Sequence, residues 1–179
     1  MNRDKGLFFH CRMAIATAIM LTLPLTTHAL PGDKDQPIQL TADSAEMDDK
    51  KGISVYIGKV FLKQGSLEIE ADKLTIYSDQ QGVSQLIAIG RPVKFRQQPN
   101  PQDPLTKGFA LKLEYDVAAD FATFTDKAKL LQGGDTFKGD RIELDLSKDI
   151  VTASSNSKNP DERVQMILQP RKNSSGNKP

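Results

Sequence analysis

The chain has 179 residues, with 24 Lys and Arg against 23 Asp and Glu, so its formal net charge is +1. A chain this close to neutral does not have the concentrated basic character that nucleic acid binding needs, so no nucleic acid partner is expected. Its length suits a single domain with one apolar core.

The first 29 residues have the three parts of a secretory signal peptide. Arg3, Lys5 and Arg12 form a basic start, residues 13–25 are mostly apolar, and Ala29 is a small residue at the cleavage site. The apolar stretch is shorter than the roughly 20 residues that a membrane-spanning helix needs. We therefore predict a signal peptide over residues 1–29, cleaved after Ala29, and export of the mature protein.

Cleavage would remove all the cysteine and histidine of the chain, namely Cys11, His10 and His28, and the chain has no Trp. It would also remove three basic residues and one acidic residue, so the mature chain would keep 21 Lys and Arg and 22 Asp and Glu. Disulfides, thiol chemistry, Ser-His-Asp triads and metal sites built from His or Cys are thereby excluded from the mature protein. We expect no catalytic residues, no cofactor and no metal.

Short segments with apolar residues at alternate positions follow one another from residue 38 to residue 168, and most close at Gly, Asp, Asn or Pro. They include residues 38–42, 53–57, 60–62, 67–71, 74–76, 87–95, 109–117, 142–146 and 164–168. Alternation of this kind predicts β-strands, and no window keeps apolar residues at helical spacing. We predict an all-β protein of repeated short antiparallel strands.

Three stretches do not follow the pattern. Residues 97–107 contain Pro99, Pro101 and Pro104, which predicts a loop, and residues 154–161 are rich in Ser and Asn. Residues 171–179 have no apolar residue, which predicts a disordered tail. The expected organisation is thus a single domain over residues 30–170 between a signal peptide and a tail.

The most informative feature is an ungapped repeat, in which residues 58–76 correspond to residues 126–144. Gln64-Gly65 matches Gln132-Gly133, and Ala71-Asp72-Lys73 matches Gly139-Asp140-Arg141. Repeated β units make extended surfaces rather than a single reaction pocket, which favours a protein that holds or carries something long. Asp43, Asp72 and Asp140 follow small residues at the ends of the expected strands, which predicts that their carboxylates stabilise turns.

This arrangement resembles the LptA/OstA family of periplasmic lipopolysaccharide-transport bridge proteins. The residues that carry the resemblance are Gly32 to Ile38, Gly58-Lys59-Val60, Gln64-Gly65, Ala71-Asp72-Lys73, Gly90-Arg91-Pro92 and Lys138-Gly139-Asp140. They span the mature chain in order, and the chain departs from the family pattern at Asp126, where the other units have Gly.

The resemblance implies a twisted, V-shaped open β-jellyroll of two facing antiparallel sheets, and a carrier rather than an enzyme. It also implies that the exported protein resides in the periplasm of a Gram-negative cell. It implies binding of the lipid A part of lipopolysaccharide and head-to-tail assembly with other copies. The implied partners are an inner-membrane component of related fold and an outer-membrane translocon with a related periplasmic domain. Residues 37–42 and 163–169 are the expected end strands for this assembly.

An apolar groove would shelter the acyl chains, and its lining is expected from the inward residues of the alternating strands. The candidates are Ile38, Leu40, Ile57, Leu67, Ile69, Ile89, Phe95, Leu113, Tyr115, Val117 and Leu144. The same residues also suit an ordinary sandwich core. Glu68 and Glu70 alternate with Leu67 and Ile69, so their carboxylates are expected to point to solvent.

Two other functions fit a β repeat in an exported chain. A polysaccharide-active β-solenoid enzyme would need stacked aromatic residues and two inward carboxylates at a defined separation, which this sequence does not indicate. A structural fibre subunit would polymerise without cargo. Lipid bound to the purified protein would distinguish a carrier from a fibre subunit.

Overall fold

The computed structural model describes residues 32–98, 100, 102–156 and 163–170. The expected signal peptide and the tail from residue 171 lie outside these residues. The described residues form η1 (Asp33–Asp35), β1 (Gln39–Thr41), β2 (Ser44–Asp48), β3 (Ile53–Gln64), β4 (Leu67–Asp79), β5 (Gly82–Gln97), β6 (Thr106–Asp116), β7 (Phe121–Gln132), β8 (Asp135–Asp145), β9 (Ile150–Ser154) and β10 (Gln165–Ile167). Only the 3-residue η1 is helical in this part of the chain, and none of its helices could span a membrane.

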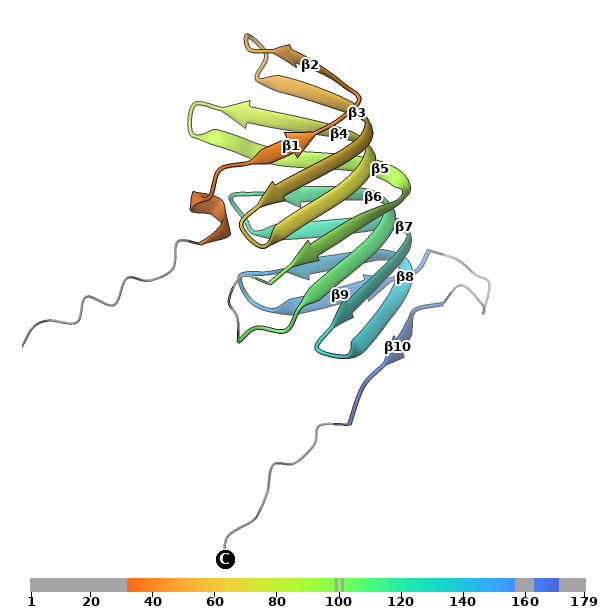
Figure 1. The fold of residues 1–179 in the computed structure, drawn as a ribbon. Helices are drawn as coiled ribbons and strands as arrows, with labels where there is room; N and C mark the ends of the chain where they lie inside the picture. Colours follow the sequence, from red (N-terminus) through yellow and green to blue (C-terminus); the bar gives the residue numbers. More distant parts are fainter. Residues whose placement is uncertain (1–31, 99, 101, 157–162, 171–179) are drawn as a thin grey trace, which may run out of the picture. The chain divides into compact units, whose positions relative to one another are not determined.

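All ten strands belong to one antiparallel sheet, which confirms the expected fold class (Figure 1). The order is β1-β3-β4-β5-β6-β7-β8-β10, with β2 also paired to β3 and β9 also paired to β8. Neighbours in the sheet are therefore mostly neighbours in sequence. The sheet does not close, because β1 and β2 at one end do not pair with β9 and β10 at the other.

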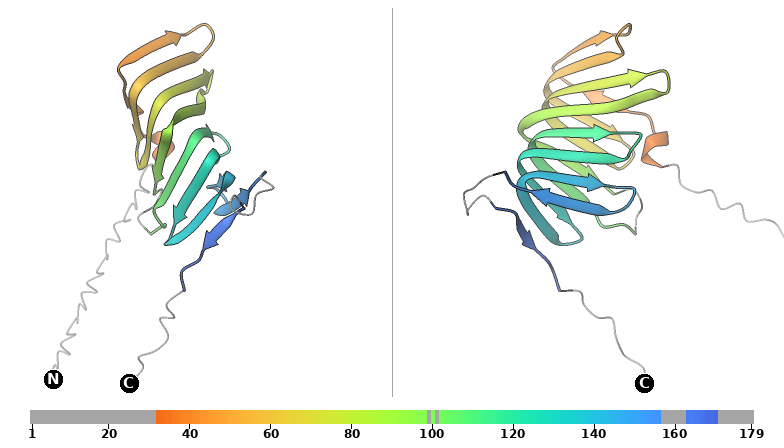
Figure 2. Two further views of the ribbon diagram at one scale, coloured as in Figure 1. Left: turned by 90° about the vertical axis from the view of Figure 1, so that its right-hand side faces the viewer. Right: turned by 180° about the vertical axis from the view of Figure 1, so that it is seen from behind.

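The long strands bend near their middle, where the pairing register shifts. The shifts lie between Ile57 and Val60, Glu70 and Lys73, Ile89 and Val93, Phe109 and Lys112, and Thr125 and Ala128. An extra residue in one strand bends it and increases its twist. Each of β3 to β8 therefore contributes one half to each of two layers (Figures 1 and 2).

We call these layers 1 and 2. Layer 1 contains residues 39–41, 60–64, 67–71, 93–97, 106–110, 128–132, 135–139 and 165–167. Layer 2 contains residues 44–48, 53–57, 73–79, 82–89, 112–116, 121–125, 141–145 and 150–154. The segments expected as separate short strands are thus halves of long bent strands, such as 53–57 and 60–62 within β3.

The repeat identified in the sequence marks this bend. Gly58 and Asp126 occupy equivalent positions, and both adopt positive φ, at 85° and 66°. Asp is one of the few residues other than Gly that tolerate this conformation, which explains why Asp126 can replace a glycine here. The prediction that Asp72 and Asp140 stabilise turns between strands is wrong, because both lie at the bend within a strand.

The core lies between the two layers. Its largest fully buried side chains are Phe95, Phe124, Leu62, Leu67, Ile69, Leu74, Leu86, Leu113, Leu130, Ile142 and Leu144. Phe95 of layer 1 meets Tyr115 and Phe124 of layer 2, with ring centroids 6.4 and 5.5 Å apart. These contacts across the middle show that the layers face each other. The predicted loop after residue 97 is also confirmed, since β5 ends at Gln97 and β6 begins at Thr106.

Candidate lipid-binding interior

The structure brings most of the predicted groove residues together between the layers. Leu67, Ile69, Phe95, Leu113, Tyr115 and Leu144 are buried in one apolar cluster. Ile38, Leu40 and Val117 are half-buried and pack against it. The interior is filled by these side chains, so acyl chains would have to part it or open the layers.

Ile57 and Ile89 do not join this cluster, and their assignment to the groove lining is corrected here. Their side chains are 51% and 49% exposed. Both pair with Lys73 on the outer surface, directly before a register shift. On β5 the inward residues before the shift are Leu86 and Ala88, whereas those after it are Val93 and Phe95. Reading one alternation through the whole strand therefore placed Ile89 on the wrong face.

A register shift also changes which residues of β6 face the interior. The sequence placed Phe109, Leu111, Leu113 and Tyr115 on one face, but Ala110 is the buried residue before the shift and Phe109 is only half-buried. The inward face of β6 changes for the same reason as that of β5, because a register shift lies between Phe109 and Lys112.

Phe124 is the main interior residue that the sequence reasoning missed. It is fully buried, and its ring packs edge-on against Phe95. Its neighbourhood is ambiguous in the sequence, because Phe121 and Ala122 are also apolar. The turn that precedes β7 and the alternation of Ala122 with Phe124 could have identified it.

Partly buried apolar residues continue the interior toward both ends of the sheet. They are Ile38, Leu40, Ala42 and Tyr56 near β1 and β2, and Phe137, Leu146, Val151 and Ala153 near β8 and β9. Beyond them, Met47 on β2 and Met166 on β10 are large apolar side chains that are exposed and in register with inward residues. Ile150 on β9 and Ile167 on β10 are also exposed, but they pair with Asp145 and Thr136 on the outer face. The apolar interior therefore extends to both unpaired ends of the sheet.

A polar cluster lies where the interior meets the turns of the hairpins. The Tyr115 hydroxyl donates to Asp120 Oδ1 at 2.6 Å. Burial raises the pKa of the Tyr115 hydroxyl far above its ordinary value, and the bond to Asp120 acts in the same direction. Tyr115 therefore remains a neutral donor, with its ring in the apolar row and its hydroxyl at the polar edge.

The outer surface of layer 1 carries paired charges. Lys63 and Arg96 both contact Glu68, at 3.0 and 3.1 Å, and Lys94 contacts Glu70 at 2.7 Å. The hydrogen bond from Lys63 lowers the pKa of Glu68. Glu68 and Glu70 thus point away from the interior, as predicted.

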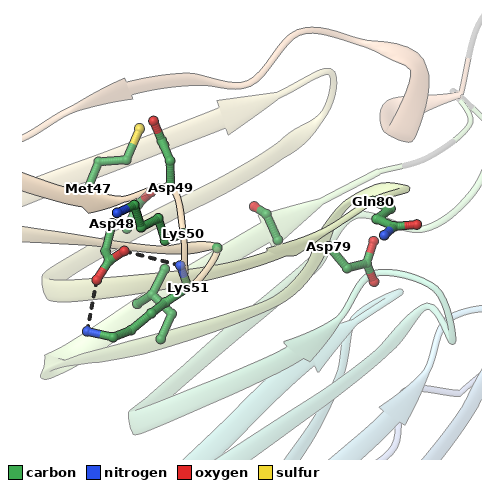
Figure 3. A pocket seen from close by; sticks show the side chains of 11 residues that line it. Met47, Asp48, Asp49, Lys50, Lys51, Asp79 and Gln80 are labelled. Carbon is green, nitrogen blue, oxygen red and sulfur yellow. Dashed lines mark hydrogen bonds and ion pairs between the residues drawn. The ribbon is translucent and has the colours of Figure 1, made fainter.

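A surface hollow of about 480 Å³ lies at the β2–β3 turn (Figure 3). Met47, Asp48, Asp49, Lys50, Lys51, Asp79 and Gln80 contribute to its lining. The Asp48 carboxylate forms an ion pair with Lys51 of the same turn, at 2.9 Å. In the part of the chain that the structure describes, no group of three potential metal ligands occurs. The hollow contains none of the predicted groove residues.

The family described as LptA/(LptD N-terminal domain) LPS transport protein matches residues 39–150, which is more than half of the chain. This chain belongs to that family. The match begins at the first residue of β1 and ends at the first residue of β9, so it covers both layers.

Named relatives in this family are lipopolysaccharide export proteins. Lipopolysaccharide export system protein LptH of Pseudomonas aeruginosa is 38% identical over 149 residues, covering 80% of this chain and 85% of LptH. Lipopolysaccharide export system protein LptA of Haemophilus influenzae is 32% identical over 156 residues, covering 86% of this chain and 88% of that protein. The protein of the same name from Escherichia coli K12 is 29% identical over 158 residues, covering 87% of this chain and 83% of that protein. These names describe transport rather than catalysis, in agreement with the expectation of a carrier.

The family fold is also seen in a solved relative. The crystal structure of LptH from Pseudomonas aeruginosa, described as the LptA homologous periplasmic component of the lipopolysaccharide transport device, matches with a TM-score of 0.72. The match has 36% identity and covers 78% of this chain and 100% of the LptH chain. The open all-β architecture is therefore shared within the family.

Proposed function

We propose that this protein carries lipopolysaccharide through the periplasm, sheltering the acyl chains of lipid A between its two layers. The observation that supports this best is the continuous apolar row between the layers, which reaches half-buried residues at both ends of the sheet. Its proposed lipid-facing residues are Ile38, Leu40, Leu67, Ile69, Phe95, Leu113, Tyr115, Val117 and Leu144. Family membership and the names of the relatives support the same cargo.

The energetics explain why such a row suits this cargo. Exposing each methylene to water costs about 0.8 kcal/mol, so a lipid with several acyl chains cannot cross an aqueous compartment unaided. The row consists mainly of Leu, Ile and Val with few aromatic rings, and flexible aliphatic side chains can be parted by an acyl chain. Sugars and phosphates of the cargo would stay in water outside the layers.

Copies of the protein are proposed to join head to tail through their end strands. Each end carries strand edges that lack a partner in the sheet, and such edges recruit further strands by β-augmentation. Because the two ends differ, the contact does not close on itself and produces a linear assembly. This assembly would bridge an inner-membrane component of related fold and an outer-membrane translocon with a related periplasmic domain.

The lipid cargo can be tested by native mass spectrometry of the protein purified from Gram-negative cells without detergent. We expect a bound mass that matches lipopolysaccharide and whose fragments contain lipid A. An unrelated periplasmic β protein purified in the same way should be free of this mass. A bare protein that also fails to take up added lipopolysaccharide would contradict the carrier and favour a fibre subunit.

A further inference from the structure

The two layers have their free ends on the same side of the molecule, opposite the bends, which we call the open side. Layer 1 ends there between β3 and β4, between β5 and β6, and between β7 and β8. Layer 2 ends there between β2 and β3, between β4 and β5, between β6 and β7, and between β8 and β9. The short η1, drawn as the orange coil in Figure 1, lies on this side. It directly precedes the residues that match the family model, which begin at Gln39.

The segment over residues 32–36 is firmly attached to layer 1. Asp33 Oδ1 accepts from the backbone N–H of Ser66 at 2.6 Å, and its Oδ2 accepts from the Ser66 hydroxyl at 2.6 Å. The same Oδ2 accepts from Gln97 Nε2 at 3.0 Å, and Gln97 is only 4% exposed. These are charge-assisted bonds in a half-buried setting, where solvent competes weakly.

The turn below this segment is shaped to receive it. Gln64 Nε2 donates to the backbone carbonyls of Lys34 and Gln36, at 3.2 and 3.0 Å. A Cβ atom at Gly65 would collide with Asp33 Oδ1 and lie 3.0 Å from Asp33 Cα. In the repeat-equivalent turn, the Gln132 side chain donates to Asp149 Oδ1 at 2.6 Å instead.

The attachment of the same segment to layer 2 is much weaker. Lys34 Nζ lies 3.3 Å from Asp120 Oδ2, in an ion pair whose side chains are 45% and 27% exposed. Exposed pairs of this kind contribute little and are screened by salt. Asp120 also accepts the Tyr115 hydroxyl, and the Tyr115 ring lies in the apolar row. Movement of Tyr115 would therefore disturb the carboxylate that holds Lys34.

We propose that residues 32–36 form a strap across the open side, hinged on layer 1 by Asp33 and clasped to layer 2 by the Lys34–Asp120 pair. Release of the clasp lets the layers part so that an acyl chain can enter, while the hinge keeps the strap in place. Displacement of Tyr115 by an entering chain favours release. This inference rests on the proposed lipid carrier for its cargo, but the strap itself can be examined without lipid.

The clasp is tested with a nitroxide at position 35, introduced as Asp35→Cys in a chain that also carries Cys11→Ser. Electron paramagnetic resonance without lipid should show a more mobile label in Lys34→Ala and Lys34→Glu, but not in Lys34→Arg. Lys94→Glu is the matched control, because it breaks an exposed ion pair with Glu70 on the outer surface. Amide exchange of Ser66 should stay slow in all these variants, since the hinge is intact.

The consequence for cargo is measured as the rate at which the protein takes up lipopolysaccharide with a fluorophore on an acyl chain. In Lys34→Ala, which lacks the ion pair with Asp120, we expect uptake to be about two- to five-fold faster. This range corresponds to the free energy that an exposed ion pair contributes. Raising the salt concentration should accelerate uptake by the unmodified chain but not by Lys34→Ala. A mobile strap with unchanged uptake would overturn the inference and leave the carrier standing. No uptake by the unmodified chain would overturn both.

The repeat supplies a second pair of variants that tests the hinge. Gly65 and Gly133 have the same φ of 58°, so alanine imposes similar backbone strain at either position. At Gly133 the nearest atom to a new Cβ is 3.5 Å away, whereas at Gly65 it would collide with Asp33. Gly65→Ala should therefore free the label at position 35, and Gly133→Ala should not. Equal label mobility in the two variants would contradict the hinge.

Discussion

Replacing Phe124 by Ala is expected to lower the free energy of unfolding by about 3–5 kcal/mol, the range for removing a buried aromatic ring. The ring is fully buried, packs edge-on against Phe95 and spans the space between the layers. Urea unfolding followed by circular dichroism measures the loss. Phe61→Ala on the outer surface is the matched control, since Phe61 is 36% exposed and should cost about 1 kcal/mol or less.

Gly108 provides a sharper test of the same packing. A Cβ atom at Gly108 would collide with the Phe124 ring, so Gly108→Ala should cost about 1–3 kcal/mol by overpacking. In a Phe124→Ala background the new methyl group enters vacated space, and the cost should largely disappear. Additive losses in the double mutant would show that Phe124 does not cover Gly108 as described.

Deleting residues 164–179 is expected to abolish concentration-dependent assembly while leaving the domain folded. The three residues of β10 pair only with Thr136, Phe137 and Lys138 of β8, and all three are exposed. Little core packing is lost with them, so the unfolding midpoint should change little. Their loss removes the edge strand proposed to dock at one end and its exposed apolar side chains, including Met166 and Ile167, and leaves β8 as the edge of layer 1. Analytical ultracentrifugation over a concentration series measures the assembly.

Deleting only residues 171–179 is the control, because it removes the tail and keeps β10. This shorter deletion should assemble like the full chain. Long oligomers of the chain without residues 164–179, at the same concentrations, would contradict the role of β10. The other edge at that end, β9, would then be the candidate contact.

Local sequence pattern predicted the strands well but not the faces of whole strands. On β4 the inward residues change from Leu67 and Ile69 to Leu74 and Ile76, and the break at Asp72-Lys73 was visible in the sequence. On β5 the alternation appeared to run on from Ile89 to Val93, so the change of face at the bend was hidden. The difference is physical, because a register shift inserts a residue without changing the apolar or polar character of its neighbours.

The strap could not be predicted from local pattern at all. Its contacts join residues far apart in sequence, with Asp33 bonded to Ser66 and Gln97 and Lys34 paired with Asp120. A polar stretch rich in Asp and Lys before the first strand reads as a flexible lead-in. Only the bend of the strands, which brings the turns of both layers to one side, gives these side chains their partners.

The central claim, that lipid lies between the layers, is tested most directly by photo-crosslinking along β5 and β6 in cells. A photoreactive residue at Leu86, Phe95 or Tyr115 should capture lipopolysaccharide, because these side chains face the interior. The same residue at Ile89, Lys94 or Glu114 should not, because these side chains lie outside the buried core. On β5 the capturing positions should therefore change from even to odd numbers across the bend, which only an interior site predicts. Equal capture at inward and outward positions, or capture confined to Ile89 and Lys94, would contradict the account.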